Sequence, residues 1–418
     1  FFHMKKLLGI YTASFKDLSL ESWMLSIVML INRTGSMVLP FLGVYMADRL
    51  NFSLEDSGLV LSCFGIGSVI GSWLGGYLTD KLGEYYVQCS SLLISVPLFC
   101  LYPLFSTPLA LGIMVLAQSI VSEMFRPANS VAIAKYANPR NLTRAFSLNR
   151  MAVNLGFSLG PALGGLMATV SYSFLFYTNA VGALAAGLVY IYFFNRRQKL
   201  FRLRQYRANR DPKAAVLPPA KEQSPYRDIT FLLFCGICTA FAVCFFQMMS
   251  SLPLFYKNSL GLSQMTIGLL MGANGFVVVV FEMLLVHTAE KRFTTAFSLF
   301  AGTLLCALSY FLLGFEPGFL LLFVSMGLLS LGEILVMPFI ATLTAQRAGG
   351  RNKGAYMGVN GMAYAIAFII APVLSTRLAT LLGFSQLWIG TAIVLIICSI
   401  AFYYIAPMLP RPGAEDMQ

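Results

Sequence analysis

Residues 318–344 read GFLLLFVSMGLLSLGEILVMPFIATLT and contain one charged side chain, that of Glu333. About 20 consecutive apolar residues suffice for a helix to cross the hydrocarbon core of a bilayer. Further stretches of the same kind recur along the chain, and we predict an all-α membrane protein with twelve transmembrane helices. The predicted spans are approximately 22–46, 57–79, 86–105, 108–134, 145–168, 173–195, 229–254, 264–287, 294–314, 318–344, 354–376 and 384–406.

The composition supports a membrane protein and excludes most other classes. Of the 418 residues, 58% are hydrophobic and 11% are charged, whereas a soluble domain has about 25% charged residues. The net charge of +12 does not indicate nucleic-acid binding, because ten of the 29 Lys and Arg residues lie between Arg196 and Arg227. The loops on the opposite side contain only Arg49, Lys257 and Arg377. By the positive-inside rule, we expect a multi-pass protein of the inner (cytoplasmic) membrane with both termini in the cytoplasm and basic residues near lipid headgroups.

The chain divides into two halves that resemble each other. Residues 196–228 are basic and then proline-rich, which predicts a cytoplasmic linker between a six-helix half at 1–195 and a second at 229–418. The basic first part of this segment is also suited to an amphipathic helix on the inner leaflet. The fourth span of each half contains a glutamate shortly before a proline: Glu123 before Pro127, and Glu333 before Pro338. Two six-helix pseudo-repeats with a binding site between them are typical of a transporter.

A short motif after the second span suggests a family. Gly76-Tyr77-Leu78-Thr79-Asp80-Lys81-Leu82-Gly83 resembles the GxLxDxxG signature of the major facilitator superfamily. The resemblance implies that Asp80, flanked by Gly76 and Gly83, pairs with a neighbouring helix end and controls closure on the cytoplasmic side. The family usually continues with two basic residues, whereas this chain has Glu84 and Tyr85.

The fifth span carries a glycine motif. Its sequence from Gly156 through Gly160 and Pro161 to Gly164 and Gly165 is similar to the GxxxGPxxGG of antiporter branches of the same superfamily. Glycines at four-residue spacing let another helix approach closely, and a proline loosens the helix backbone. Two interpretations stay open here, simple helix packing and a role of Gly160 and Pro161 in gating.

Only three carboxylates lie inside predicted spans, namely Glu123, Glu282 and Glu333. A charge at this depth is costly and is usually functional, and burial and neighbouring charges tune a carboxyl group for protonation. We therefore predict proton coupling through these three residues, with Glu333 as the first candidate. The string Ser330-Leu-Gly-Glu333-Ile334 also looks like the tenth span of proton-coupled peptide transporters. The alternative for Glu333 is a protonated structural residue.

The cations inside the spans are candidates for binding an anionic group. Arg126 lies three residues after Glu123 and neighbours it on a helix, so protonation of Glu123 would free Arg126; a static buried pair is the alternative. Arg33, beside Asn32, suits bidentate recognition of a carboxylate, or else contacts backbone carbonyls. Arg150 lies toward the cytoplasmic side of its span, where we predict a gating pair across helices.

Four uncharged polar residues complete the predicted substrate site. They are Gln247, Asn274, Asn360 and Tyr364. Each is expected either to hydrogen-bond the substrate or to join neighbouring helices.

The function predicted from these patterns is secondary active transport by alternating access. No GxxxxGK[ST] motif occurs, so a proton gradient rather than ATP is the expected driving force. We predict no cofactor, no metal site and no enzymatic activity, and a small-molecule substrate moved by a functional monomer. The glycine motif favours an exporter of the drug:proton antiport type; the alternative is a proton symporter for peptide-like, zwitterionic or anionic solutes.

Overall fold

The computed structural model describes residues 9, 11–34, 38–208, 224–315, 318–349 and 352–410, and these residues form helices without any strand. The first half contains α2 (Leu20–Thr34), α3 (Val38–Asp48), α4 (Leu54–Leu82), α5 (Glu84–Leu101), α6 (Pro108–Glu123), α7 (Phe125–Tyr136), α8 (Leu142–Val170) and α9 (Tyr172–Ala208). The second half contains α10 (Ile229–Asn258), α11 (Gln264–Arg292), α12 (Thr295–Leu313), α13 (Phe319–Ala348), α14 (Lys353–Leu382) and α15 (Phe384–Ile405).

The helices account for the twelve predicted spans. Ten stretches of the described residues are long and apolar enough to cross a membrane, and α8 and the pair α2–α3 make up the other two. The fourth span is interrupted at Met124, which separates α6 from α7. Helix α9 continues to Ala208, so the basic segment predicted as a linker begins as helix, and residues 209–223 lie outside the described part.

Each half has its own hydrophobic core. The largest cluster of buried side chains lies wholly in the second half, around Phe241, Tyr310 and Trp388. The first half has separate clusters, one of which also includes Ala345 and Met357 of the second half. The halves are therefore two packed units with limited shared core.

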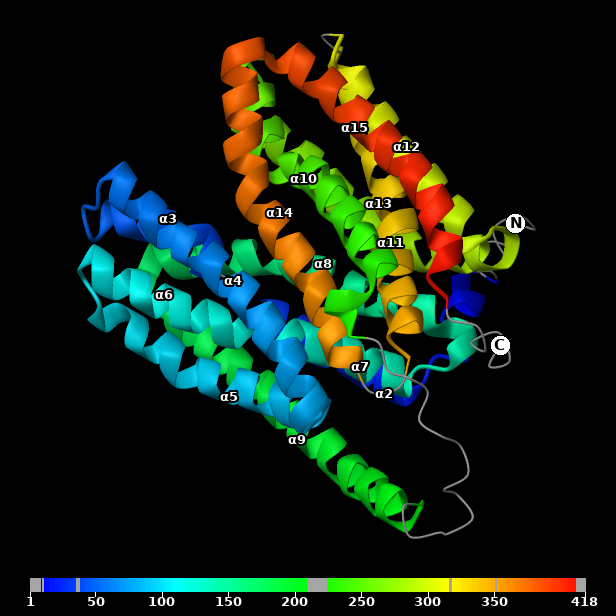
Figure 1. Ribbon diagram of the computed structural model, residues 1–418. Helices are drawn as coiled ribbons and strands as arrows, with labels where there is room; N and C mark the ends of the chain where they lie inside the picture. The colour runs from blue at the N-terminus through cyan, green and yellow to red at the C-terminus, as the bar shows by residue number, and fades with distance from the viewer. Residues whose placement is uncertain are drawn as a thin grey trace.

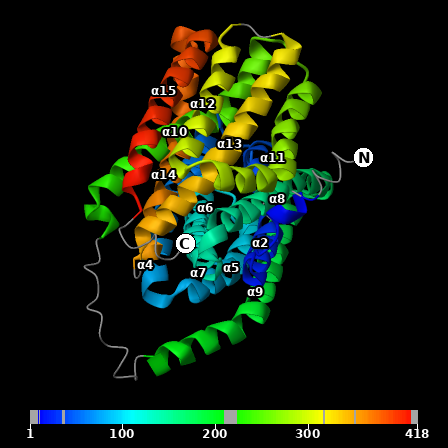
Figure 2. The same ribbon diagram turned by 90° about the vertical axis from the view of Figure 1, so that its right-hand side faces the viewer.

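The halves meet at one end of the bundle and diverge toward the other (Figure 1). We call the first the Asp80 end, after a residue in the last turn of α4, and the second the Asn51 end, after a residue between α3 and α4. The halves meet through α4 and α14 and through α8 and α11, and also where α7 packs on α14 and α8 on α13. At the Asn51 end, the turn between α3 and α4 lies far from the turn between α14 and α15. The same division is visible from the side (Figure 2).

Close approach of α4 and α14 depends on glycine. A Cβ atom on Gly76 would lie 2.5 Å from the Gly354 carbonyl oxygen, which is far inside van der Waals contact. The opposing glycine meets the same limit, because a Cβ on Gly354 would collide with the Gly76 carbonyl. Small residues allow this kind of helix contact in membranes, and here they seal the Asp80 end.

Candidate functional site

A buried ion-pair network joins the two halves at the centre of the bundle. Arg150 of α8 donates from Nε to Glu282 Oε1 of α11 at 2.8 Å, and from Nη1 to Glu333 Oε1 of α13 at 2.8 Å. The side chains of Glu282 and Glu333 are 0% and 6% exposed, and that of Arg150 is 16% exposed. One cation from the first half thus holds two carboxylates of the second.

Uncharged groups orient Glu333 from its other side. Asn274 of α11 donates from Nδ2 to Glu333 Oε2 at 3.2 Å and to Ser330 Oγ at 2.9 Å. The Arg150 and Asn274 contacts therefore occupy both oxygens of Glu333. By contrast, Glu282 Oε2 and Arg150 Nη2 are buried without a hydrogen-bond partner among the described residues.

The network has unequal charge. One guanidinium faces two carboxylates, so the fully ionised cluster carries one uncompensated negative charge, and a single bound proton neutralises it. Removing one partner of a buried pair typically costs about 3–5 kcal/mol. A change in protonation here consequently changes the strength of a contact that holds the halves together.

The sequence predicted a cross-helix pair for Arg150 and proton coupling for Glu282 and Glu333, and the structure brings these three residues together. The predicted span of Glu333, 318–344, contains no cation. The structure shows that the cation comes instead from α8, because Arg150 and Glu333 meet only through packing of the two halves.

A second cluster of charges lies within the first half. Glu123, at the end of α6, accepts from Arg126 Nη1 at 3.2 Å, so the predicted pair forms across the break at Met124. Arg33 of α2 lies within electrostatic range of both, and its Nε atom is buried without a hydrogen-bond partner in the described part of the chain. Gly156 of α8 packs directly on Arg33, because a Cβ there would lie 2.6 Å from the Arg33 Cβ.

Arg126 is an exposed cation among buried neighbours. Its side chain is 46% exposed, whereas its neighbours Phe125 and Pro127 are buried. Helix α7, which carries Arg126, packs against α14 of the other half. An exposed cation with buried neighbours, close to both halves, marks an interior space rather than a lipid-facing surface.

The Asp80 motif has the geometry that the resemblance implied. Asp80 accepts hydrogen bonds from the backbone N–H groups of Gly354 and Ala355, both at 2.7 Å, at the N-terminus of α14. A carboxylate at a helix N-terminus is favourable because it satisfies free N–H groups and the helix dipole. Gly83 ends α4 with φ of +91°, a conformation that favours glycine. Glu84, where the family usually has a cation, pairs with Lys135.

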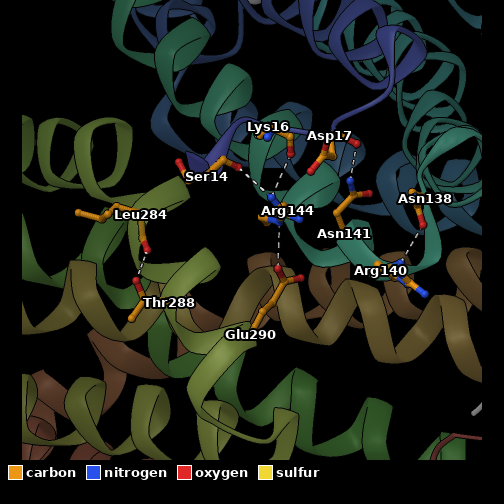
Figure 3. A network of polar contacts seen from close by, with 10 residues as sticks. All are labelled: Ser14, Lys16, Asp17, Asn138, Arg140, Asn141, Arg144, Leu284, Thr288 and Glu290. Atoms are coloured by element: carbon orange, nitrogen blue, oxygen red, sulfur yellow. Dashed lines mark hydrogen bonds and ion pairs between the residues drawn. The ribbon is translucent and has the colours of Figure 1, made fainter. Parts of the chain in front are cut away.

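A further contact between the halves was missed from the sequence. Arg144 of α8 binds Glu290 of α11, with Nε and Oε2 3.1 Å apart. It also donates to the carbonyl oxygens of Ser14 and Lys16, so the N-terminal segment lies over this pair (Figure 3). Glu290 was not considered as a candidate because it lies outside the predicted spans. Glu290 follows Glu282 by about two helical turns, and Arg144 precedes Arg150 by nearly two turns. This matching spacing of acidic and basic residues on the two helices is the signal that would have found the pair.

The remaining predicted residues lie in different surroundings. Gln247 accepts from Thr391 Oγ1 of α15 at 3.1 Å, which joins helices within the second half. Asn360 is buried, with its Oδ1 lacking a partner among the described residues. Asn32 lies beside Arg33 on α2, and Gly160 is buried on α8. The side chain of Pro161 falls outside the described set. Among the described residues, no cluster of His, Cys, Asp and Glu is suited to a metal.

Comparison with known proteins places the chain in a family. The family model described as Major Facilitator Superfamily matches residues 24–315 and 290–416. The chain belongs to the Major Facilitator Superfamily. It is therefore a multi-pass membrane transporter with twelve membrane spans, not an enzyme, and it acts on small molecules.

Individual members of the superfamily extend this comparison. The chain is 27% identical over 375 residues to the uncharacterized MFS-type transporter YttB of Bacillus subtilis (strain 168), covering 89% of this chain and 92% of YttB. It is 25% identical over 335 residues to the multidrug resistance protein MdtH of Yersinia pestis (strain Pestoides F), covering 79% of each. Its fold is similar to that of a POT family transporter solved with a thioalcohol-conjugated peptide, with a TM-score of 0.64, 17% identity and coverage of 93% and 96%.

Proposed function

We propose that the protein is a proton-coupled secondary active transporter that exports a small organic solute in exchange for protons. The observation that carries this proposal is the position of Arg150, held between Glu282 and Glu333 across the interface of the halves. Protonation of either carboxylate weakens one ion pair, because the guanidinium then donates to a neutral carboxyl group; a charge-assisted hydrogen bond contributes about 1.5–3 kcal/mol. Binding of a proton and opening of the Asp80 end are then coupled through the network of Arg150, Glu282 and Glu333.

The proposed cycle uses the arrangement of the two ends. With the Asp80 end in the cytoplasm, as the distribution of cations supports, the closed contacts there correspond to an outward-open conformation. A proton that enters from the outside binds the Arg150 network and loosens it, which favours opening to the cytoplasm. Release of the proton inside restores the network, and the solute moves outward as the transporter returns.

Export is favoured over uptake by two observations outside the network. The glycine motif of α8 is similar to that of antiporter branches, and a relative at 25% identity is named a multidrug resistance protein. Uptake by symport is the second candidate, and the exposed Arg126 is the observation that favours it, because an exporter of lipophilic cations has little use for an exposed guanidinium.

The proposed roles are tested with Glu333→Gln in reconstituted vesicles. The amide keeps the shape of the side chain but cannot be ionised, so we expect loss of pH-driven transport while solute exchange without a gradient persists. Glu55→Gln is the matched control, because Glu55 is exposed at the start of α4. Full pH-driven transport by the Glu333→Gln variant would remove Glu333 from the proton pathway.

A further inference from the structure

The charges facing the central space do not balance within the first half. Among the described residues, Arg33 and Arg126 lie near one carboxylate, that of Glu123. Arg150 does not share in this group, because Glu282 and Glu333 already bind it. The group of Arg33, Arg126 and Glu123 therefore carries one surplus positive charge inside the membrane, where an uncompensated charge is costly.

Arg126 is the member of this group that a solute can reach. Its contact with Glu123 is a single hydrogen bond of 3.2 Å from Nη1, and its side chain remains 46% exposed. A guanidinium has five N–H donors in a planar fork that matches a carboxylate with two parallel bonds. An incoming carboxylate thus offers Arg126 a better geometry than Glu123 does.

Aromatic side chains flank the same space. Phe157 of α8 is exposed, and the Arg33 guanidinium carbon lies 5.5 Å from its ring centroid. Tyr364 belongs to α14, which packs against α7, the helix of Arg126, and Phe368 follows it by one turn as an exposed ring. A ligand with an apolar ring and one negative group could contact both the aromatic side chains and the guanidinium groups.

We propose that the solute is an amphipathic organic carboxylate whose charged group binds Arg126 in place of Glu123, with its apolar body between Phe157 and Tyr364. This inference rests on the proposed function only in taking the space between the halves as the solute pathway. Glu123 then acts as an internal competitor that satisfies Arg126 while the site is empty.

The test compares three ligands that share a phenyl ring and a four-carbon chain and differ in the terminal group, which is anionic, neutral or cationic. Radiolabelled 4-phenylbutyrate, 4-phenylbutanol and 4-phenylbutylamine are titrated against the purified full-length protein in nanodiscs at one pH, without a proton gradient. We expect the carboxylate to bind at least about tenfold more tightly than the alcohol and the amine, since a charge-assisted hydrogen bond contributes about 1.5–3 kcal/mol. Equal affinities, or no saturable binding of the carboxylate, would overturn the proposal.

Variants assign the preference to residues. In Arg126→Gln, we expect the preference for the carboxylate to fall to within about twofold, while alcohol binding persists and shows that the variant is folded. Glu123→Gln should bind the carboxylate several-fold more tightly, because the internal competitor loses its charge. Arg377→Gln is the matched control, since Arg377 is an exposed cation of α14. A preference that survives Arg126→Gln contradicts the assignment.

The outcome is separable from that of the proton proposal. Binding at fixed pH does not involve the Arg150 network, so Glu333→Gln should keep the carboxylate preference. A protein that selects the carboxylate but shows no proton-driven flux would contradict the proton coupling alone.

Discussion

Replacing Arg150 by glutamine should open the Asp80 end of the transporter. Arg150 makes two charge-assisted hydrogen bonds between the halves, each 2.8 Å long. At about 1.5–3 kcal/mol for each bond, their loss destabilises the closed conformation by about 3–6 kcal/mol. Since 1.4 kcal/mol corresponds to a factor of ten, the closed-to-open ratio should fall by roughly 10²- to 10⁴-fold.

The assay is a distance measurement between spin labels in nanodiscs, in a variant without the native cysteines. One pair of labels replaces Leu82 and Phe293, which are exposed at the Asp80 end on opposite halves. The other pair replaces Asn51 and Leu382 at the Asn51 end, where both are exposed. In the Arg150→Gln variant, the first distance should lengthen and the second should shorten.

Two further variants make the result specific to the network. Arg377→Gln removes an exposed cation near the Asn51 end and should leave both distances unchanged. Combining Arg150→Gln with Glu282→Gln and Glu333→Gln removes the buried negative charges that Arg150→Gln leaves unpaired. This triple variant should return part of the population to the closed form. Unchanged distances in Arg150→Gln would refute the reasoning that this network holds the halves together.

Three other substitutions test separate parts of the structure. Arg33→Lys should fail to restore transport, because a point charge does not reproduce the guanidinium fork; wild-type flux in vesicles would show that charge suffices. Gly76→Val should prevent closure of the Asp80 end and abolish transport, since even a Cβ atom would lie 2.5 Å from the Gly354 oxygen; transport at the wild-type rate would contradict the close contact. Burial would raise the pKa of Asp228, but hydrogen bonds from Arg347, Tyr356 and the Phe231 amide outweigh it and hold that pKa below its usual value. Its contribution to stability is therefore present above the unfolded pKa of about 3.9 and is lost as the pH falls through the lower folded pKa. Asp228→Asn should lower the melting temperature at neutral pH by removing one partner of a buried pair, a loss of about 3–5 kcal/mol. In strong acid, the difference in melting temperature between Asp228→Asn and wild type should be smaller than at neutral pH. An equal difference at both pH values would count against this role.

The membrane spans were predictable from the sequence because span length and hydropathy are local properties. The twelve spans and the two halves follow from runs of apolar residues. The break at Met124 was not predicted, although Pro127 lacks the N–H group that would bond to the Glu123 carbonyl and therefore favours an interruption there. The basic segment after span six is helical as far as Ala208, as its sequence suggested; its place on the inner leaflet stays a prediction.

The site was predictable in its residues but not in its partners. Elimination identified Glu123, Glu282 and Glu333 because charges within apolar spans are few. Which cation each carboxylate binds depends on how α8 packs against α11 and α13, and no local pattern encodes that packing. The pair of Glu123 and Arg126 was foreseen because its partners lie three residues apart. The cross-half partners of Arg150 and Arg144 were not.

Proton flux in vesicles tests the central claim most directly. Purified protein is reconstituted into liposomes that contain a pH-sensitive dye, and alanylalanine, 4-phenylbutyrate and ethidium are added in turn, with and without an imposed proton gradient. We expect at least one solute to change the internal pH with the wild-type protein, and we expect Glu333→Gln to abolish this change. Alkalinisation of acid-loaded vesicles would indicate antiport, and acidification would indicate symport. Movement of a solute with no change of internal pH in either direction would contradict proton coupling.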